Sequence, residues 1–388
     1  MLRTNMKKNK STIVKAILLT VILIVSSLAV SCSSSAYTNY GWTGSVVDGD
    51  VIYVASQGKI TALQKDNGTV KWQREIEKDT APASPLSCGM GAAASVIYAD
   101  PVVSDGVVYV ATYSGKIFAY NTASGNLLWK YPSEGYVEGI IGGLIIDNGS
   151  IYFAAVGGTV TALNAETQQV EWQYDTEDTL WASPCMDGDT LFVASYDKRL
   201  FAIDINSGNL KWDRPFETDG PITAAPIYDN GVVYIGSLDR GIYAINAQNG
   251  QLIWEFTAES DAEYTPRNWF WATPLMVDGV IYAPNMDGFV YIIDSADGTL
   301  ITALDMENAM SADPVLNGDR VIVATQHGDI HSINIEDNSK FLLKSLDLTV
   351  QSSLYVDEGI IYVHTIRTEN LYAINGGSGV VVWYYEVS

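Results

Sequence analysis

The sequence predicts an all-β protein of eight four-stranded antiparallel sheets, and three features support this fold class. Residues 225–254 hold four short apolar runs separated by tight-turn sequences, which is typical of an antiparallel meander. The runs carry apolar residues on both alternating faces, so each sheet needs cover on two sides. The same pattern recurs about every 44 residues, and neighbouring copies can cover each other when they close around a channel. We therefore expect an eight-bladed β-propeller.

The chain begins with the pattern of an export signal. Residues 1–15 are basic and residues 17–30 are almost entirely apolar, a run too short to span a bilayer comfortably. The run ends in Leu-Ala-Val-Ser-Cys at residues 28–32, which resembles the lipobox of bacterial lipoproteins, with Ala29 where leucine is usual. That resemblance implies cleavage before Cys32 and diacylation of its thiol. We expect residues 1–31 to be a lipoprotein signal peptide.

The residues after Cys32 predict a short tether to a membrane. Serines follow the cysteine directly, and a tether over residues 32–41 spans at most about 35 Å. The propeller is expected over residues 42–388. The protein should therefore be exported and held by its lipid on the extracytoplasmic side of a membrane. Ser33 rather than Asp follows the cysteine, which resembles an outer-membrane sorting signal if the cell has two membranes.

The charge of the chain excludes one class of partner. Lys and Arg number 22 against 45 Asp and Glu, and five of the cations lie in the leader, so 17 cations face 45 acids in the mature protein. A net charge of about −28 repels phosphate backbones. We expect no nucleic-acid partner.

Turn sequences divide the chain into eight copies. Each copy starts with a first strand, a two-residue turn ending in Gly, and a second strand rich in Ile, Val and Tyr. The turns are Asp48-Gly49, Asp105-Gly106, Asn148-Gly149, Asp187-Gly188, Asn230-Gly231, Asp278-Gly279, Asn317-Gly318 and Glu358-Gly359. A third and a fourth strand follow in every copy, which gives each blade four strands.

The fourth strand closes on a tryptophan in six of the copies. These are Trp72, Trp129, Trp172, Trp212, Trp254 and Trp383, whereas copies six and seven have Ile301-Thr302 and Phe341-Leu342 there. The spacing of Ala, Gly and Trp in residues 119–129 and its counterparts resembles the tryptophan-docking motif of pyrroloquinoline-quinone-type propeller repeats. The resemblance implies that the Ala lets an indole from the next blade lie flat, and that the tryptophans are structural. Copy three has Gln168 where the motif has Gly, so its turn is either strained or of another type.

Connections of very different length share one face of the predicted ring, which we call the long-loop face. It carries the loops between second and third strands and all blade-to-blade links, because the short turns lie on the opposite face. The links at residues 73–99 and 255–271 are the longest. Long loops on a rigid scaffold commonly carry function.

Aromatic residues are predicted at the channel mouth on the long-loop face. Tyr98, Trp181 and Trp271 each precede a small motif that leads into a first strand. In quinoprotein dehydrogenases a tryptophan stacks on the quinone, but we favour the interpretation that these rings plug a wide channel. Polar and metal-binding partners for a quinone with Ca²⁺ cannot be assembled from the sequence: Cys32, Cys88 and Cys185 are not adjacent, and the three histidines are scattered. We predict no catalytic and no metal-binding residue.

The link before the sixth first strand combines aromatic residues with an arginine. Arg267, Trp269, Phe270 and Trp271 are the residue types that anchor protein interfaces when they are exposed together. The same residues can instead fold over the channel as a lid that buries Trp269 and Phe270. Both interpretations place a binding surface on the long-loop face.

The first hypothesis for function is a non-enzymatic, membrane-anchored scaffold that binds envelope or membrane proteins. Size, lipobox, tether and repeats resemble the propeller lipoprotein family of the outer-membrane β-barrel assembly machinery, which implies a role in outer-membrane protein assembly and no cofactor. One alternative is a quinoprotein oxidoreductase dependent on pyrroloquinoline quinone and Ca²⁺. Another is a polysaccharide-binding propeller that uses the aromatic rim.

Overall fold

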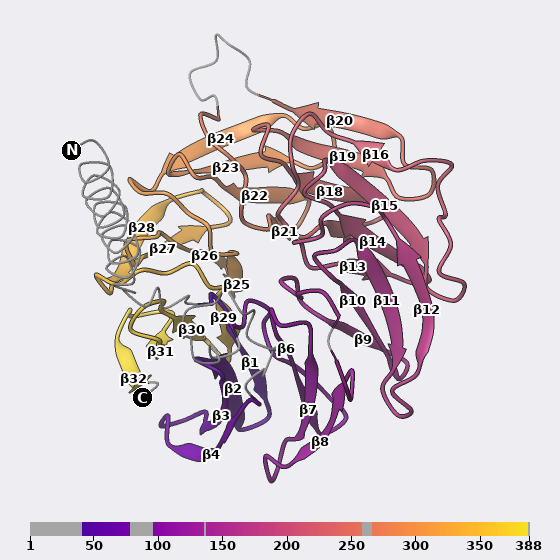
Figure 1. The fold of residues 1–388 in the computed structure, drawn as a ribbon. Helices are drawn as coiled ribbons and strands as arrows, with labels where there is room; N and C mark the ends of the chain where they lie inside the picture. The colour runs from indigo at the N-terminus through magenta and orange to yellow at the C-terminus, as the bar shows by residue number, and fades with distance from the viewer. Residues whose placement is uncertain (1–40, 78–95, 136, 258–265, 387–388) are drawn as a thin grey trace, which may run out of the picture. The chain divides into compact units, whose positions relative to one another are not determined.

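The computed structural model describes residues 41–77, 96–135, 137–257 and 266–386, and its 32 strands form eight four-stranded sheets. The sheets stand in a ring, and the first strands of neighbouring blades contact each other around its centre (Figure 1). The first strands of blades one and eight also make contact, which closes the ring. The predicted eight-bladed propeller is confirmed. The predicted signal peptide, Cys32 and the tether up to residue 40 lie outside the described residues.

Each blade uses four consecutive strands of the chain. Blade one holds β1 (Ser45–Asp48), β2 (Val51–Ser56), β3 (Lys59–Gln64) and β4 (Val70–Glu75). Blade two holds β5 (Val102–Ser104), β6 (Val107–Ala111), β7 (Ile117–Asn121) and β8 (Leu127–Tyr131). Blade three holds β9 (Ile145–Asp147), β10 (Ser150–Ala154), β11 (Thr159–Asn164) and β12 (Val170–Asp175). Blade four holds β13 (Cys185–Asp187), β14 (Thr190–Ala194), β15 (Arg199–Asp204) and β16 (Phe216–Glu217).

The second half of the ring repeats this order. Blade five holds β17 (Ile227–Asp229), β18 (Val232–Gly236), β19 (Ile242–Asn246) and β20 (Leu252–Phe256). Blade six holds β21 (Leu275–Val277), β22 (Val280–Pro284), β23 (Phe289–Asp294) and β24 (Leu300–Asp305). Blade seven holds β25 (Val315–Asn317), β26 (Arg320–Ala324), β27 (Asp329–Asn334) and β28 (Lys340–Ser345). Blade eight holds β29 (Tyr355–Asp357), β30 (Ile360–His364), β31 (Asn370–Asn375) and β32 (Val381–Glu386). None of the described residues forms a helix able to cross a membrane.

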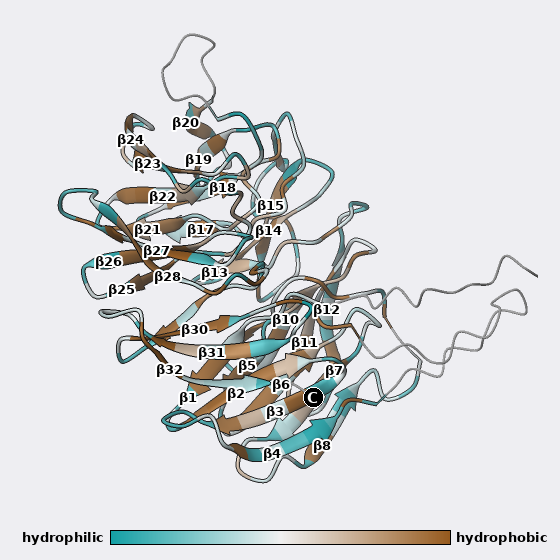
Figure 2. Ribbon diagram, turned by 90° about the vertical axis from the view of Figure 1, so that its left-hand side faces the viewer, coloured by the Kyte–Doolittle hydropathy of each residue, from teal (hydrophilic) through white to brown (hydrophobic). Residues whose placement is uncertain are grey.

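The core lies in the second and third strands of each blade. In β10 and β14 every residue is buried, because neighbouring blades cover both faces of the sheet. The outer strands are more polar than the inner ones: Figure 2 shows teal parts in β4 and β8, whereas β22, a second strand, is brown. The predicted hairpin turns take the expected left-handed backbone, with φ of 46° at Asn230 and 86° at Gly231.

Tryptophans on the outer strands join each blade to the one that follows. The indole N–H of Trp72 donates to the carbonyl of Thr122 in blade two at 2.8 Å, and its ring lies on Gly125, where a Cβ atom would stand 2.6 Å from the indole. The same contact pairs Trp172 with Gly208, Trp212 with Gly250, Trp254 with Gly298 and Trp383 with Gly68. The prediction that the Ala receives an indole from the next blade is wrong. Ala62 is the cross-strand neighbour of Trp72 in its own blade, and the indole covers the turn of the next blade.

Gln168 adopts the left-handed backbone conformation at a turn position where most copies have glycine. Its φ is 55°, and its amide Nε2 donates to the carbonyls of Ala165 and Glu166 at 3.0 and 2.6 Å. The turn belongs to blade three. Trp129, on the outer strand of blade two, is only partly buried. The turn is therefore of the same type as in the other copies, and Gln168 carries the strain.

We expect Gln168→Gly to raise the free energy of unfolding by about 0.5–1 kcal/mol, because glycine removes the left-handed strain and clears the surface facing Trp129. Urea unfolding monitored by fluorescence measures this difference. Gln168→Ala keeps the Cβ atom and loses the amide bonds, so it should lower the stability. A glycine variant less stable than the wild type contradicts the prediction.

Blade four departs from the predicted strand pattern. The sequence places its fourth strand at Trp212, but β16 is only Phe216–Glu217 and Trp212 lies outside it. Six positions separate Trp212 from Thr218, whereas four separate Trp172 from Thr176, so the chain has two extra residues here. Pro215 also lacks the N–H that a strand pair needs. The outer strand consequently bulges between its two ends.

Blade seven has no docking tryptophan, and Leu343 takes its place against the next blade. Phe341 and Leu342 are 40% and 55% exposed and do not dock. Leu343 packs into the core cluster shared with blade eight, and its carbonyl oxygen stands 2.0 Å from the position of a Cβ atom on Gly379. The register shift in β28 moves the docking position by one residue.

Candidate functional site

The long-loop face is tied to the ring by backbone hydrogen bonds between links and loops. Tyr196 N–H donates to the carbonyl of Thr179 at 2.8 Å, and Met286 N–H donates to that of Trp269 at 3.0 Å. Equivalent bonds recur in other blades, such as that from Tyr113 to Val96 at 2.9 Å. Side chains on these links are therefore presented from a fixed backbone.

The predicted aromatic residues lie at the inner ends of three links and do not meet one another. Tyr98 packs between Trp42 and Tyr113, with ring centroids 4.2 and 5.5 Å away. Trp181 packs on Tyr196 at 4.4 Å, and Trp271 is half-buried in blade six.

Trp42, Tyr113 and Tyr196 were not predicted as part of this site. Trp42 holds in blade one the position that Tyr98 holds in blade two. It was missed because the motif after it reads Thr-Gly-Ser instead of Ala-X-Pro. Tyr113 and Tyr196 lie on loops between second and third strands, and only the fold brings them to the links.

A belt of hydrogen bonds joins neighbouring blades just inside the aromatic residues. Gly143 N–H donates to Ser183 Oγ at 2.6 Å, and Ala225 N–H donates to Thr273 Oγ1 at 3.2 Å. Thr273 N–H in turn donates to Asp313 Oδ1 at 2.7 Å, and Gly44 N–H donates to Asp100 Oδ1. The polar side chains before the first strands therefore join blades.

Two carboxyl groups in this belt have perturbed titration. Burial, with the Asp313 charge, raises the pKa of Asp100 to about 7 even though Gly44 donates to it. Burial also raises the pKa of Asp313, whose Oδ2 accepts from Ser353 Oγ at 3.3 Å. The described residues contain no group of three or more His, Cys, Asp or Glu side chains placed to hold a metal ion.

The residues around the mouth do not fit pyrroloquinoline quinone. The quinone is a polycarboxylate and needs cationic partners, but the positions that lead into the first strands carry no Lys or Arg. These positions are Trp42, Gly44, Tyr98, Asp100, Ile141, Gly143, Trp181, Ser183, Thr223, Ala225, Trp271, Thr273, Ser311, Asp313, Gln351 and Ser353. Carboxyl groups at two of them would repel the ligand.

The link at residues 266–271 combines both predicted roles. Phe270 is fully buried, with its ring 5.7 Å from that of Tyr291, so it anchors the link. Trp269 is 47% exposed and Arg267 is exposed. Arg267 N–H donates to Asp287 Oδ2 at 2.8 Å, which fixes the backbone beneath its free side chain. Arg267 and Trp269 are thus available to a partner, whereas Phe270 is not.

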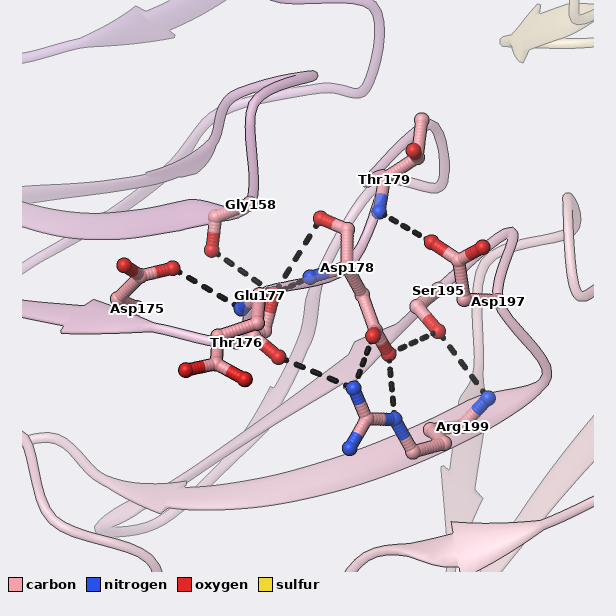
Figure 3. Close-up of polar contacts among 9 residues, drawn as sticks. All are labelled: Gly158, Asp175, Thr176, Glu177, Asp178, Thr179, Ser195, Asp197 and Arg199. Atoms are coloured by element: carbon pink, nitrogen blue, oxygen red, sulfur yellow. Dashed lines mark hydrogen bonds and ion pairs between the residues drawn. The ribbon is translucent and has the colours of Figure 1, made fainter.

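A polar cavity of about 470 Å³ lies between blades three and four on the same face. Asp178, 5% exposed, accepts from Arg199 Nε at 2.7 Å and from Ser195 Oγ at 2.8 Å (Figure 3). Arg199 also donates to the carbonyl of Thr176 at 3.1 Å and lies over the Phe201 ring. Sequence reasoning missed this pair, because Asp178 lies in the link that enters blade four and Arg199 begins the third strand of that blade. Glu177, Asp197 and Glu217 complete an acidic lining.

We expect Arg199→Lys to lower the free energy of unfolding by about 1 kcal/mol. Lysine keeps the charge but cannot make the two-pronged contact with Asp178, and the side chain of Arg199 is about one-third exposed, which limits the loss. Thermal unfolding measures the change, and Lys198→Arg at the neighbouring exposed position serves as a control with no expected effect. Unchanged stability of Arg199→Lys would show that the paired geometry is unimportant.

Eight blades, docking tryptophans and the loops on one face define a propeller of pyrroloquinoline-quinone-type repeats. A family profile described as outer membrane protein assembly factor BamB matches residues 85–215, 179–304 and 286–388. The chain belongs to this family.

Relatives of the same name align over part of their length. The outer membrane protein assembly factor BamB of Legionella pneumophila is 34% identical over 91 residues, which are 24% of this chain and 22% of the relative. That of Moranella endobia is 26% identical over 180 residues, 43% of this chain and 42% of the relative. The chain therefore matches less than half the length of these relatives.

Solved structures share the fold. BamB from Moraxella catarrhalis has a TM-score of 0.62 and 22% identity, with 74% of this chain and 87% of that chain covered. A europium-containing methanol dehydrogenase has a TM-score of 0.63 and 13% identity, with 83% and 81% covered. At these identities the likeness concerns the fold alone.

Proposed function

We propose that this protein is a non-enzymatic scaffold that binds an envelope or membrane protein through its long-loop face during outer-membrane protein assembly. The observation that carries the proposal is the exposed pair Arg267 and Trp269 on a link whose backbone is fixed by Asp287 and Phe270. Arginine and tryptophan are enriched among residues that dominate binding energy at interfaces. Membership of the BamB family supports the assembly role.

We further propose that diacylated Cys32 holds the propeller at the membrane. The lipobox-like sequence ends at Cys32, and the described propeller starts at residue 41, so the disc stays within a short reach of the bilayer. Mass spectrometry of the native amino-terminal peptide should find the lipid. Cys32→Ala should move the protein from the membrane to the soluble fraction.

Photocrosslinking in cells tests the scaffold function. A photoreactive amino acid at position 269 should crosslink to a membrane protein. The same amino acid at Asp66, on the opposite face, should not. Absence of any crosslink from position 269 and from neighbouring exposed positions of the long-loop face would refute the proposal.

The alternative is a quinoprotein oxidoreductase: Trp181 and Trp271 are half-buried at the channel mouth, but the mouth lacks the cations that the carboxylates of the quinone need. Incubation with pyrroloquinoline quinone and Ca²⁺, followed by a dye-linked alcohol assay, separates the two. If the wild type turns over the alcohol and the variants Trp181→Ala and Trp271→Ala do not, the protein is an enzyme and the proposal of a non-enzymatic scaffold is wrong.

A further inference from the structure

Cations replace glycine in two neighbouring loops of the long-loop face. The loop between second and third strands uses a left-handed residue, which is Gly115, Gly158, Gly288 or Gly328 in four blades. In blades four and five this residue is Lys198, with φ of 75°, and Arg240, with φ of 78°. A left-handed residue with a Cβ atom costs roughly 1 kcal/mol.

The hydrogen bond that closes this turn is slightly longer in the two cation loops than in the glycine loops. In this turn the N–H of the left-handed residue donates to the carbonyl three residues earlier. This turn bond measures 3.3 Å from Lys198 to Ser195 and 3.2 Å from Arg240 to Ser237. It measures 2.9 Å at Gly115, Gly158 and Gly328 and 3.1 Å at Gly288. Both side chains are exposed, so packing against the core does not compensate this cost.

The carboxylates beside these cations are engaged by the fold. Asp197 Oδ2 accepts from Thr179 N–H at 2.6 Å, and Asp239 Oδ2 accepts from Gly220 N–H and the Tyr243 hydroxyl, both at 2.9 Å. Asp287 plays the same part in blade six, where it accepts from the N–H of Arg267 at 2.8 Å.

Three cations therefore occupy neighbouring blades without an ion-pair partner. Among the described residues, no carboxylate forms a salt bridge with Lys198, Arg240 or Arg267. The opposite face is acidic at most of its turns, as at Asp48, Asp105, Asp187, Asp229, Asp278 and Asp357.

We propose that Lys198, Arg240 and Arg267 bind carboxylates of an acidic, extended segment of a partner protein laid across blades four to six. This inference rests on the proposed scaffold function and names the chemistry of its partner. Arg267 lies beside the exposed Trp269, so an apolar side chain of the same segment has a contact there.

A peptide fits this surface better than an anionic membrane. Glu177 and Glu217 line the cavity next to Lys198, and a flat anionic surface would be repelled by them. A flexible chain can place single carboxylates at each cation and leave the intervening acids in water.

The test uses the full chain and a short fluorescein-labelled peptide of alternating glutamate and tyrosine, at about 20 mM salt, where screening is weak. Fluorescence anisotropy should detect binding that weakens about fivefold in the double variant Lys198→Gly, Arg240→Gly. The same variant should unfold roughly 2 °C higher, because glycine relieves both turns.

Arg367→Gly is the matched control. Arg367 is exposed and left-handed, with φ of 70°, in blade eight. The Arg367→Gly variant should be more stable than the wild type and should bind the peptide with unchanged affinity. An equal loss of binding in this control, no binding by the wild type, equal binding of a lysine-containing peptide, or tighter binding to phosphatidylglycerol vesicles would each overturn the proposal.

The two proposals fail separately. If position 269 crosslinks a partner with equal yield in the wild type and the double glycine variant, the cations are not the contact and the scaffold function stands. If no crosslink forms in the wild type, the scaffold function itself is wrong.

Discussion

Replacing Trp383 with alanine should lower the free energy of unfolding by about 3–5 kcal/mol and loosen the closure of the ring. Trp383 is 9% exposed, and its indole N–H donates to the carbonyl of Lys65 in blade one at 2.9 Å. The ring lies on Gly68. Blades eight and one contain the two ends of the propeller, so no link crosses this junction and side chains carry the closure.

Trp129→Ala is the control for this effect. Trp129 has the same place in blade two, but it is partly buried and meets a turn with Gln168 instead of glycine. Its replacement should cost clearly less, about 2 kcal/mol. Urea unfolding of both variants gives the comparison. Equal losses would show that all junctions contribute alike and that the open junction has no special role.

Polar contacts strengthen the same junction without replacing the indole. Lys65 Nζ lies 2.6 Å from Asp357 and 2.9 Å from Glu358, both partly or largely exposed, so water and salt weaken these pairs. His364 Nδ1 lies 2.7 Å from the Thr43 carbonyl in the buried part of the junction. Burial lowers the pKa of His364 to about 4, so it contributes there as a neutral ring near pH 7.

The fold was predictable because local signals repeat. Each hairpin needs left-handed residues that Asn-Gly and Asp-Gly supply, and each docking turn needs a glycine under an indole. The position of the fourth strand in blade four was not predicted, although counting from Trp212 to Thr218 reveals the two extra residues. The contact of Leu343 with the next blade depends on a register shift that hydrophobic pattern alone does not define.

The candidate site was predictable only where one segment carries it. Tyr98, Trp181 and Trp271 share a local motif, and Arg267 and Trp269 lie in one link. The Asp178–Arg199 pair and the packing of Trp181 on Tyr196 join different segments of the chain. Such contacts join a link to a loop or strand that follows it in the fold, and the local sequence pattern does not specify which of these meet. The strain at Lys198 and Arg240 likewise becomes visible only through φ.

Replacing Asp100 with asparagine should stabilise the protein at alkaline pH and have little effect in acid. Asparagine keeps an acceptor for Gly44 N–H but has no charge to bury beside Asp313. A pKa raised to about 7 corresponds to roughly 4 kcal/mol at 1.4 kcal/mol per pKa unit. Asp100 remains partly exposed at the channel mouth, so water screens its charge and we expect about 2 kcal/mol.

The sign of this pH dependence follows from proton binding. Because the pKa of Asp100 is higher in the folded than in the unfolded protein, the folded state binds more protons between about pH 4 and pH 7. Its contribution to stability is therefore lost as the pH rises through that window. The difference in unfolding free energy between Asp100→Asn and the wild type should be near zero at pH 4, rise to its full value by pH 8, and stay flat above. Asp66→Asn removes the same charge from an exposed turn and should give no such rise. A difference in unfolding free energy that stays constant from pH 4 to pH 8 would mean that Asp100 is ionised throughout. Burial and the charge of Asp313 would then not raise its pKa.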